Sequence, residues 1–242
     1  MKVWYLDHSA VAVKTEKHLL LFDLAGKALS GQPGEGLAEG CVNPDEIKDE
    51  DVLVFVSHEH KDHFDPAIFS LREKLSRVRF VLPEELDEVY QADLFVSAEE
   101  EQCKHYALPD CHITTFASTD IGVAYLLEID GLLIYHAGDL NWWHWAEEDL
   151  AWNRNMEANF KRYTEPLRGR RVDLAMLPLD SRLKTGGYLG PNYFLNLMEV
   201  RRFLPMHQWE DFAFTDEFLS AYPQFAPITV KIHRDEEFLG EL

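Results

Sequence analysis

The segment Val52-Leu-Val-Phe-Val-Ser-His-Glu-His-Lys-Asp-His63 decides the fold of this chain. Its first five residues are all apolar, which is typical of a buried β-strand. The H-x-H-x-D-H motif at residues 58–63 then places three imidazoles and one carboxylate within six positions. Neutral imidazole and carboxylate are the usual ligands of zinc, manganese and iron, and a loop at a strand end can direct them into one site. The motif therefore predicts a metal centre, with a solvated His-rich loop as the alternative.

Length and composition limit the classes of protein to which this chain can belong. With 242 residues the chain can bury a sizeable core, and we predict a single domain over residues 1–242. No apolar run is long enough to cross a bilayer, and Asp7 and His8 interrupt any apolar region of a signal peptide. The three cysteines lack metal or disulfide spacing, which suits a reducing compartment. The sequence thus predicts a cytoplasmic protein without a membrane partner.

The net charge of -20 excludes a further class of partner. Such a charge keeps a protein soluble and repels polyanions, so nucleic acid is a poor candidate partner. The basic clusters are short, and solvated helix faces and turns account for them. We therefore expect a small-molecule substrate, and a homo-oligomer stays open.

Hydrophobic patterning predicts mixed sheets with helices outside them, in one domain with two facing sheets. The Gly-rich segment 26–40 lacks the Lys-Ser/Thr ending of a phosphate-binding loop, so we interpret it as an irregular surface loop. Asp65-Pro66 is a good helix start, and Asp130-Gly131 is a tight hairpin signal. The expected strands are 3–6, 10–14, 19–22, 52–56, 78–82, 93–97, 112–116, 123–129, 132–135 and 174–177, and the expected helices are 66–75, 83–90, 145–167 and 191–203.

Two further residues that can bind a metal ion stand at predicted strand ends. Asp139 follows a strand and the small pair Ala137-Gly138, so the backbone can turn tightly there and present the carboxylate. His207 ends the short stretch Leu204-Pro205-Met206 after a predicted helix. Both are expected to contribute to the metal centre.

In this order, the H-x-H-x-D-H motif, Gly138-Asp139 and Pro205-Met206-His207 resemble the metallo-β-lactamase superfamily. The resemblance spreads through most of the chain and implies an α+β fold, a four-layer αββα sandwich with a metal centre at one edge of the paired sheets. It also implies hydrolysis by a metal-bound hydroxide. The branch that includes ascorbate-6-phosphate lactonase is the most similar, because His8-Ser9-Ala10 precedes a Leu-Leu-Leu-Phe-Asp strand end here as well.

The resemblance also implies a set of ligands. His58 and His60 would belong to the first metal, whereas Asp62, His63 and His207 would hold the second, and Asp139 would bridge the two. The superfamily normally adds one more histidine to the first site, in a loop about twenty residues before the bridging aspartate.

This sequence departs from that pattern, because its loop reads Ala117-Ser-Thr-Asp-Ile-Gly122. Asp120 as an oxygen donor, Ser118 holding a water, or a filled second site alone are the open alternatives. One or two divalent ions are expected. Zinc is favoured, and manganese, which prefers oxygen ligands, and iron stay open.

Other residues are candidates for substrate contacts. His8 is expected either to contact substrate or the ligands, or to lie in a surface turn, and His144 either reaches the site or packs beside three tryptophans. Arg182 and Lys184 could bind a phosphate or carboxylate, unless Arg182 makes a structural contact with Asp180.

The predicted function is therefore metal-dependent hydrolysis of a small, anionic lactone, ester or phosphodiester. Asp62 would both bind metal and accept a proton from the nucleophile. Motifs for a serine nucleophile, a redox cysteine pair or a dinucleotide are absent from the sequence. The alternatives are an iron-dependent oxidoreductase on the same scaffold and a non-catalytic descendant that binds metal or ligand.

Overall fold

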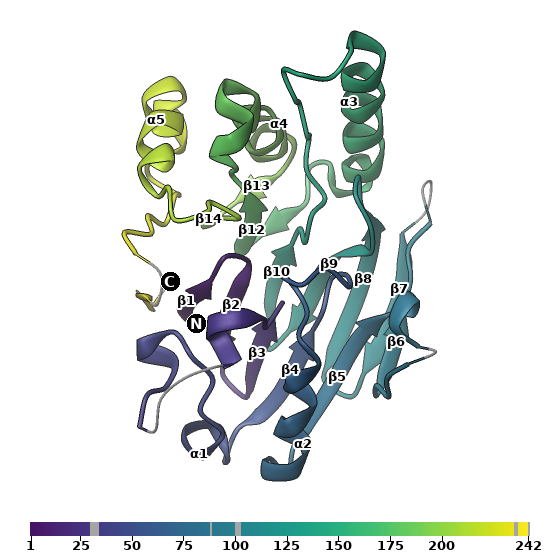
Figure 1. Ribbon diagram of the computed structural model, residues 1–242, viewed down its shortest axis with the longest axis vertical. Coiled ribbons are helices and arrows are strands. Elements are labelled where there is room, and N and C mark those ends of the chain that lie inside the picture. Colours follow the sequence, from purple (N-terminus) through teal and green to yellow (C-terminus); the bar gives the residue numbers. More distant parts are fainter. Residues whose placement is uncertain (30–33, 88, 100–102, 235–236, 242) are drawn as a thin grey trace. The chain divides into compact units, whose positions relative to one another are not determined.

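The computed structural model describes residues 1–29, 34–87, 89–99, 103–234 and 237–241 (Figure 1). These residues form two compact units. The first unit comprises residues 1–96 and 232–242, and the second comprises residues 97–231. The expectation of a single domain over the whole chain stays a prediction.

The first unit is built on a mixed sheet whose strand order is β15-β1-β2-β3-β4-β5-β6 (Figure 1). Neighbours from β15 to β3 are antiparallel, and those from β3 to β6 are parallel. The strands are β1 (Lys2–Asp7), β2 (Ala10–Lys14), β3 (His18–Phe22), β4 (Asp51–Phe55), β5 (Val78–Pro83), β6 (Leu94–Val96) and β15 (Glu237–Glu241). The predicted strands of this half are confirmed, whereas β15 was not predicted.

Strand direction brings three loops of the first unit to one edge of this sheet. Strands β3 and β4 are parallel, and β1 runs in the same direction because β1 and β3 are both antiparallel to β2. The carboxyl ends of these strands therefore lie at the same edge. His8, Asp23 and the H-x-H-x-D-H motif follow β1, β3 and β4 respectively.

Short helices flank the strands of the first unit. Asp65 caps the predicted helix after the motif by accepting a hydrogen bond from Ala67 N, but that helix opens as 3₁₀ turns before its α-helical part. The interpretation of segment 26–40 as an irregular loop is wrong for its described ends, since Ala28 and Leu37 are buried in short helical turns; residues 30–33 lie outside the described residues. The predicted helix at 83–90 is shorter than expected. The helices are η1 (Gly26–Leu29), η2 (Leu37–Glu39), α1 (Pro44–Ile47), η3 (Pro66–Ser70), α2 (Leu71–Lys74) and η4 (Glu84–Leu86).

The second unit has its own mixed sheet, with the order β14-β12-β10-β9-β8-β7. The strands are β7 (Lys104–Leu108), β8 (Cys111–Ala117), β9 (Val123–Ile129), β10 (Leu132–His136), β12 (Leu174–Pro178) and β14 (Phe203–Met206). Strands β10, β12 and β14 are parallel, and β8 shares their direction because β8 and β10 both oppose β9. The residues that follow these four strands, among them Asp120, Asp139, Asp180 and His207, therefore lie at one edge.

The helices of the second unit correct two predictions. The predicted helix 145–167 is α3 (Leu150–Thr164) with η5 (Glu165–Leu167), capped by Asp149. The predicted helix 191–203 is wrong beyond residue 197, because α4 (Leu189–Leu197) ends before the short strand β13 (Glu199–Val200). Strand β13 pairs with β11 (Arg171–Val172), so pairing with a neighbouring strand overrides local helix propensity. The remaining helices are η6 (Ser181–Tyr188), α5 (Ala213–Ala221) and η7 (Pro223–Phe225).

The central strands supply each unit's core. Residues 52–56 are fully buried, and burying a Val, Leu or Phe side chain is worth about 1.5–3 kcal/mol. No helix within the described residues is long and apolar enough to cross a membrane.

Tyr135 on β10 provides a test of the second core. Its side chain is fully buried beside Phe194, burial raises the pKa of its hydroxyl, and that hydroxyl has no hydrogen-bond partner among the described residues. We expect Tyr135→Phe to keep or raise the free energy of unfolding, by about 1 kcal/mol, because a buried unpaired hydroxyl is costly. Denaturant unfolding measures this change.

Tyr5 is the matched control, since its buried hydroxyl donates a 2.7 Å hydrogen bond to the His8 carbonyl. Tyr5→Phe should lower the free energy of unfolding by about 1 kcal/mol. Equal losses in the two variants would contradict the assignment of Tyr135 as unsatisfied.

Candidate metal centre

The H-x-H-x-D-H motif occupies the loop after β4 in the first unit. His58 and His63 are buried, Asp62 is half-buried and His60 is exposed. The backbone nitrogens of His63 and Phe64 both donate to the His60 carbonyl, and this tight turn gathers the motif. Nε2 of His58 lies 3.1 Å from Nδ1 of His60, and the ring centroids of His58 and His63 are 4.1 Å apart. The structure therefore brings the predicted ligands of the motif together.

Asp23, which follows β3, fixes the orientation of His63. Its Oδ2 lies 2.8 Å from His63 Nδ1, and its two oxygens accept hydrogen bonds of 2.7 Å from the backbone nitrogen and hydroxyl of Ser57. An ionised carboxylate only accepts hydrogen bonds, so His63 carries its proton on Nδ1 and its lone pair on Nε2. A histidine that binds metal through one ring nitrogen usually donates the proton of its other ring nitrogen to a group such as a carboxylate, which fixes the orientation of the ring.

The same chain of hydrogen bonds reaches His58. The Ser57 hydroxyl donates its one proton to Asp23, so at 2.9 Å it accepts from His58 Nδ1. His58 therefore also presents the lone pair of Nε2. One buried aspartate thus sets the tautomer of two predicted ligands.

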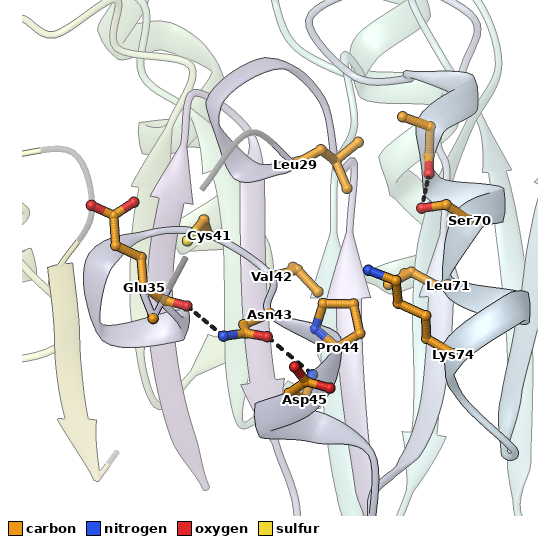
Figure 2. A pocket seen from close by; sticks show the side chains of 12 residues that line it. Leu29, Glu35, Cys41, Val42, Asn43, Pro44, Asp45, Ser70, Leu71 and Lys74 are labelled. Carbon is orange, nitrogen blue, oxygen red and sulfur yellow. Dashed lines mark hydrogen bonds between the residues drawn. The ribbon is translucent and has the colours of Figure 1, made fainter. Parts of the chain in front are cut away.

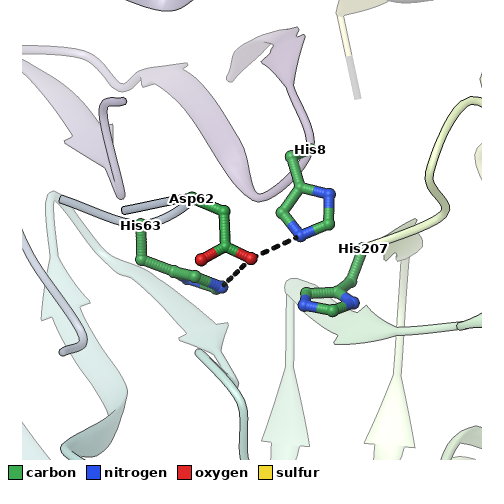
Figure 3. Close-up of side chains that lie close together, drawn as sticks. All are labelled: His8, Asp62, His63 and His207. Atoms are coloured by element: carbon green, nitrogen blue, oxygen red, sulfur yellow. Dashed lines mark ion pairs between the residues drawn. The ribbon is translucent and has the colours of Figure 1, made fainter. Parts of the chain in front are cut away.

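His8 contacts the motif from the turn between β1 and β2 (Figure 3). Its Nε2 lies 3.4 Å from Asp62 Oδ2, and the Nε2 of His63 lies 4.0 Å from the same oxygen. The interaction with the nearby His8 imidazole holds the pKa of Asp62 well below its usual range; burial opposes this shift and the charge of His63 adds to it. Asp62 is accordingly a carboxylate at neutral pH. The catalytic role of His8 stays a prediction.

The second unit holds a similar arrangement around His207, which follows β14. Its Nε2 lies 3.4 Å from Asp139 Oδ1, and its Nδ1 lies 3.0 Å from Asp180 Oδ2. Because an ionised Asp180 can only accept, His207 presents its Nε2 lone pair toward Asp139. Trp143 supports both residues: its Nε1 donates to the Asp139 carbonyl at 3.0 Å, and its ring packs edge-on to His207.

Arg182 pairs with the fully buried Asp180. Its Nε lies 3.0 Å from both carboxylate oxygens, and its Nη2 lies 2.5 Å from Oδ2. Burial by itself would raise the pKa of Asp180, but the hydrogen bonds from His207 and Arg182 lower it to about 2. The contact between Arg182 and Asp180, one of the two alternatives left open by the sequence, is therefore present. The guanidinium also lies over Trp209, 4.5 Å from the ring centroid.

Asp120 lies in the loop where the third histidine of the first site would stand. One of its carboxylate oxygens is within 4.8 Å of one of Asp139, and its backbone nitrogen donates to Ser118 Oγ at 3.1 Å. The Ser118 hydroxyl thus helps to shape the loop. This placement fits the alternative in which Asp120 is an oxygen donor.

The other candidates lie in the second unit. His144 is half-buried, and its carbonyl would lie 2.6 Å from a Cβ added at Gly186, so only glycine fits there. Lys184 is exposed and has a φ of 52°, which is strained for a lysine. His136 is buried, and its Nδ1 accepts from Gly138 N, in keeping with an orienting role. The catalytic roles of His144, Arg182 and Lys184 stay predictions.

The donor atoms of each unit fit a divalent metal ion. Two ligand atoms about 2.0–2.1 Å from one zinc lie about 3.4 Å apart at the tetrahedral angle. His8 and Asp62 show this 3.4 Å separation in the first unit, and His207 and Asp139 show it in the second. The tautomers of His63 and His207 direct an Nε2 lone pair to each set. Metal-ligand chemistry therefore explains both arrangements.

A separate pocket of about 370 Å³ lies in the first unit (Figure 2). Asn43 shapes it by donating to the Glu35 carbonyl and accepting from Asp45 N, which caps α1. The residues that line this pocket include none of the predicted site residues. The pocket is thus distinct from the candidate metal centre.

Comparisons with known proteins agree with this assignment, although no family model matches the sequence. The chain is 26% identical over 216 residues to a UPF0173 metal-dependent hydrolase of Pyrococcus furiosus, covering 86% of this chain and 84% of that protein. A UPF0173 metal-dependent hydrolase of Bacillus velezensis is 30% identical over 156 residues, which cover 57% of this chain and 63% of that protein.

Solved structures share the fold. Igni18, a metallo hydrolase from Ignicoccus hospitalis, is 19% identical with a TM-score of 0.62, covering 99% of this chain and 96% of that one. The metallo-β-lactamase fold protein YhfI of Bacillus subtilis is 14% identical with a TM-score of 0.58, covering 90% and 91%. CmlA, a diiron β-hydroxylase from Streptomyces venezuelae, is 11% identical with a TM-score of 0.65, covering 96% and 53%.

The α+β fold class is therefore confirmed, and the chain shares its fold with a metallo-β-lactamase fold protein, in agreement with the resemblance of its motifs. The relationship to the ascorbate-6-phosphate lactonase branch stays a prediction. The sequence-based assignment of the site overlooked the support of the ligands by Asp23, Ser57 and Trp143. Asp23 could have been found, because it follows a buried strand that is a parallel neighbour of β4.

Asp23→Asn tests the support of His63. We expect the affinity for zinc to fall by about 10- to 100-fold, because an amide no longer fixes the Nδ1–H tautomer. Competition with a chromophoric chelator measures the dissociation constant.

Asp93→Asn is the matched control, since Asp93 accepts hydrogen bonds from Phe80 N and Arg72 at another strand of the same unit. This variant should lose some stability and keep its zinc affinity. A comparable loss of affinity in both variants would count against a specific role for Asp23.

Proposed function

We propose that the protein is a metal-dependent hydrolase of a small anionic lactone, ester or phosphodiester. The observation that carries the proposal is that each unit has an imidazole Nε2 at 3.4 Å from a carboxylate oxygen, and that Asp23 and Asp180 fix the tautomers of His63 and His207. The names of its relatives, metal-dependent hydrolases, support the same class. The substrate class rests on the sequence resemblance and on the basic residues Arg182 and Lys184.

The proposed ligand set follows the sequence prediction. By that prediction, His58 and His60 would hold the first ion with Asp120 as an oxygen donor, Asp62, His63 and His207 would hold the second, and Asp139 would contribute to both. When bound, a divalent ion lowers the pKa of a coordinated water toward neutrality and stabilises negative charge on the reacting group. Zinc is the favoured ion, and the added oxygen donor keeps manganese open.

The side chains of this chain perform the remaining tasks. The lowered pKa of Asp62 keeps it ionised, which favours metal binding and allows only transient acceptance of a proton. Asp23 and Asp180 hold the imidazoles of His63 and His207 in their binding orientation. Lys184, which is exposed, would bind an anionic group of the substrate, while Arg182 is largely committed to Asp180.

Cytoplasmic localisation, a small-molecule substrate and the exclusion of nucleic acid remain parts of the proposal that rest on the sequence. An iron-dependent oxidoreductase is the second candidate, since the diiron hydroxylase CmlA shares the fold. Iron in the purified protein together with oxygen- or thiol-dependent turnover would favour this candidate. A non-catalytic metal-binding protein is the third.

Metal analysis tests the proposal directly. Elemental analysis of protein purified without added metal should find about one or two divalent ions per chain, and zinc, manganese or iron should raise the melting temperature of chelator-treated protein. His63→Ala and Asp139→Ala should abolish hydrolysis of a panel of lactones, esters and phosphodiesters. A protein without metal, whose melting temperature no added metal changes, would refute the proposal.

Lys184→Gln tests anion recognition. We expect KM for an anionic substrate to rise about 2- to 5-fold, as for the loss of an exposed charge pair, with little change in kcat. The KM of a neutral ester should not change. Lys74→Gln, a substitution at the separate pocket of the first unit, is the control and should leave both constants unchanged.

A further inference from the structure

We propose that His8 is a direct ligand of the metal ion held by Asp62 and His63, so that the first unit supplies a complete three-ligand site. This inference rests on the proposed function, because it presupposes that the motif binds a divalent ion. It changes the assignment of His8 from a substrate contact to a metal ligand. It also gives this ion three ligands from the first unit, in addition to the proposed His207.

The backbone holds His8 in an uncommon conformation. The residue lies at the turn between β1 and β2 with a φ of 34°, outside the regions that most side chains prefer. The hydrogen bond from Tyr5 to the His8 carbonyl, 2.7 Å long, and the irregular register between β1 and β2 maintain this turn. Such backbone strain is often found where a side chain has a function. The conformation directs the imidazole to the motif.

The distances fit coordination better than a direct hydrogen bond. His8 Nε2 is 3.4 Å from Asp62 Oδ2, longer than the usual range of about 2.7–3.2 Å for an N–H···O bond. The same separation is that of two ligands of one tetrahedral ion. A donor atom of each of His8, Asp62 and His63 lies within 4.8 Å of the others.

Ring orientation and burial agree with this geometry. The rings of His8 and His63 meet edge-on, with an interplanar angle of 83° and centroids 5.8 Å apart, so they are not stacked (Figure 3). The side chains of His8 and His63 are 11% and 0% exposed, whereas that of Asp62 is 36% exposed. The site is thus enclosed by imidazoles and accessible on the side of the carboxylate. A catalytic ion with three protein ligands needs such an accessible position.

The donor set determines which ions this site would take. Two imidazoles and one carboxylate bind zinc in hydrolases, and the same combination with open positions binds ferrous iron. His8 therefore adds an imidazole to the Asp62–His63 site. The predicted His58–His60 site, in contrast, lacks the third imidazole that the superfamily normally supplies. The two predicted ions should consequently differ in affinity. The tight ion is the one bound by His8.

Metal titration of the full-length, chelator-stripped protein tests this proposal. Zinc affinity is measured by chelator competition, and cobalt(II) absorption reports the ligands of the tight ion. We expect His8→Gln to weaken tight zinc binding at least 100-fold and to change the cobalt spectrum. His207→Gln should retain one tightly bound zinc, whose X-ray absorption spectrum shows two imidazoles.

His112→Gln is the matched control, because His112 is an exposed histidine on β8 of the second unit and should leave metal binding unchanged. Should His8→Gln lower the melting temperature of the metal-free protein, His8→Asn repeats the test with a residue that tolerates positive φ. The Tyr5 hydrogen bond is kept in both variants because it ends on the backbone.

The outcomes separate the two hypotheses. If the unmodified protein binds zinc and the His8 variants bind it with unchanged affinity and spectrum, His8 is only a hydrogen-bond partner of Asp62, and this inference fails alone. If the unmodified protein binds none of the metals, the proposed function fails as well. Loss of tight zinc binding in the His8 variants, together with its retention in His112→Gln, supports the ligand assignment.

Discussion

The hydrogen bond between Asp23 and Nδ1 of His63 is the interaction on which the first unit's site depends. Both side chains are almost completely buried, where an unpaired charge would cost several kcal/mol. Ser57 lowers the cost of burying the carboxylate by donating two hydrogen bonds to it. The sheet makes this possible, because Asp23 and Ser57 follow the parallel strands β3 and β4. The position of the imidazoles is thus determined by the strand pairing.

The second unit also stabilises a buried pair of aspartate and histidine, but with different residues. Asp180 supports His207 as Asp23 supports His63, but its second partner is the cation Arg182. A buried carboxylate shared between an imidazole and a guanidinium remains ionised, as its pKa of about 2 indicates. Arg182 consequently acts through Asp180 on His207. A residue that looks like an anion-binding group in the sequence has a structural partner.

The sequence was most informative where the local pattern and the sheet agree. The motif after 52–56, the hairpin at Asp130-Gly131 and most strands could be predicted, because apolar periodicity and turn residues report local structure. The pairing of Asp180 with His207 could not, since it depends on the parallel register of β12 and β14. The end of α4 was missed for the same reason, because it depends on the pairing of β13 with β11, which is distant in the sequence.

His8 shows that a sequence motif does not identify every residue of the candidate site. The sequence places it 50 residues before His58, so spacing gives no reason to count it among the ligands. Only the direction of β1, set by two antiparallel pairings, brings its turn to the edge where β4 ends. A ligand supplied in this way is determined by topology, and a local sequence motif cannot reveal it.

Charge completes the argument about substrate. The net charge of -20 repels a long polyanion, which meets many surface carboxylates at once. A small anion within the site responds mainly to charges within about 8 Å, the Debye length at physiological ionic strength. Because Asp62 and Asp139 lie next to imidazoles, and a divalent ion adds two positive charges, the local field can attract a small anion. The acidic surface and an anionic substrate are therefore compatible, provided that the metal is bound.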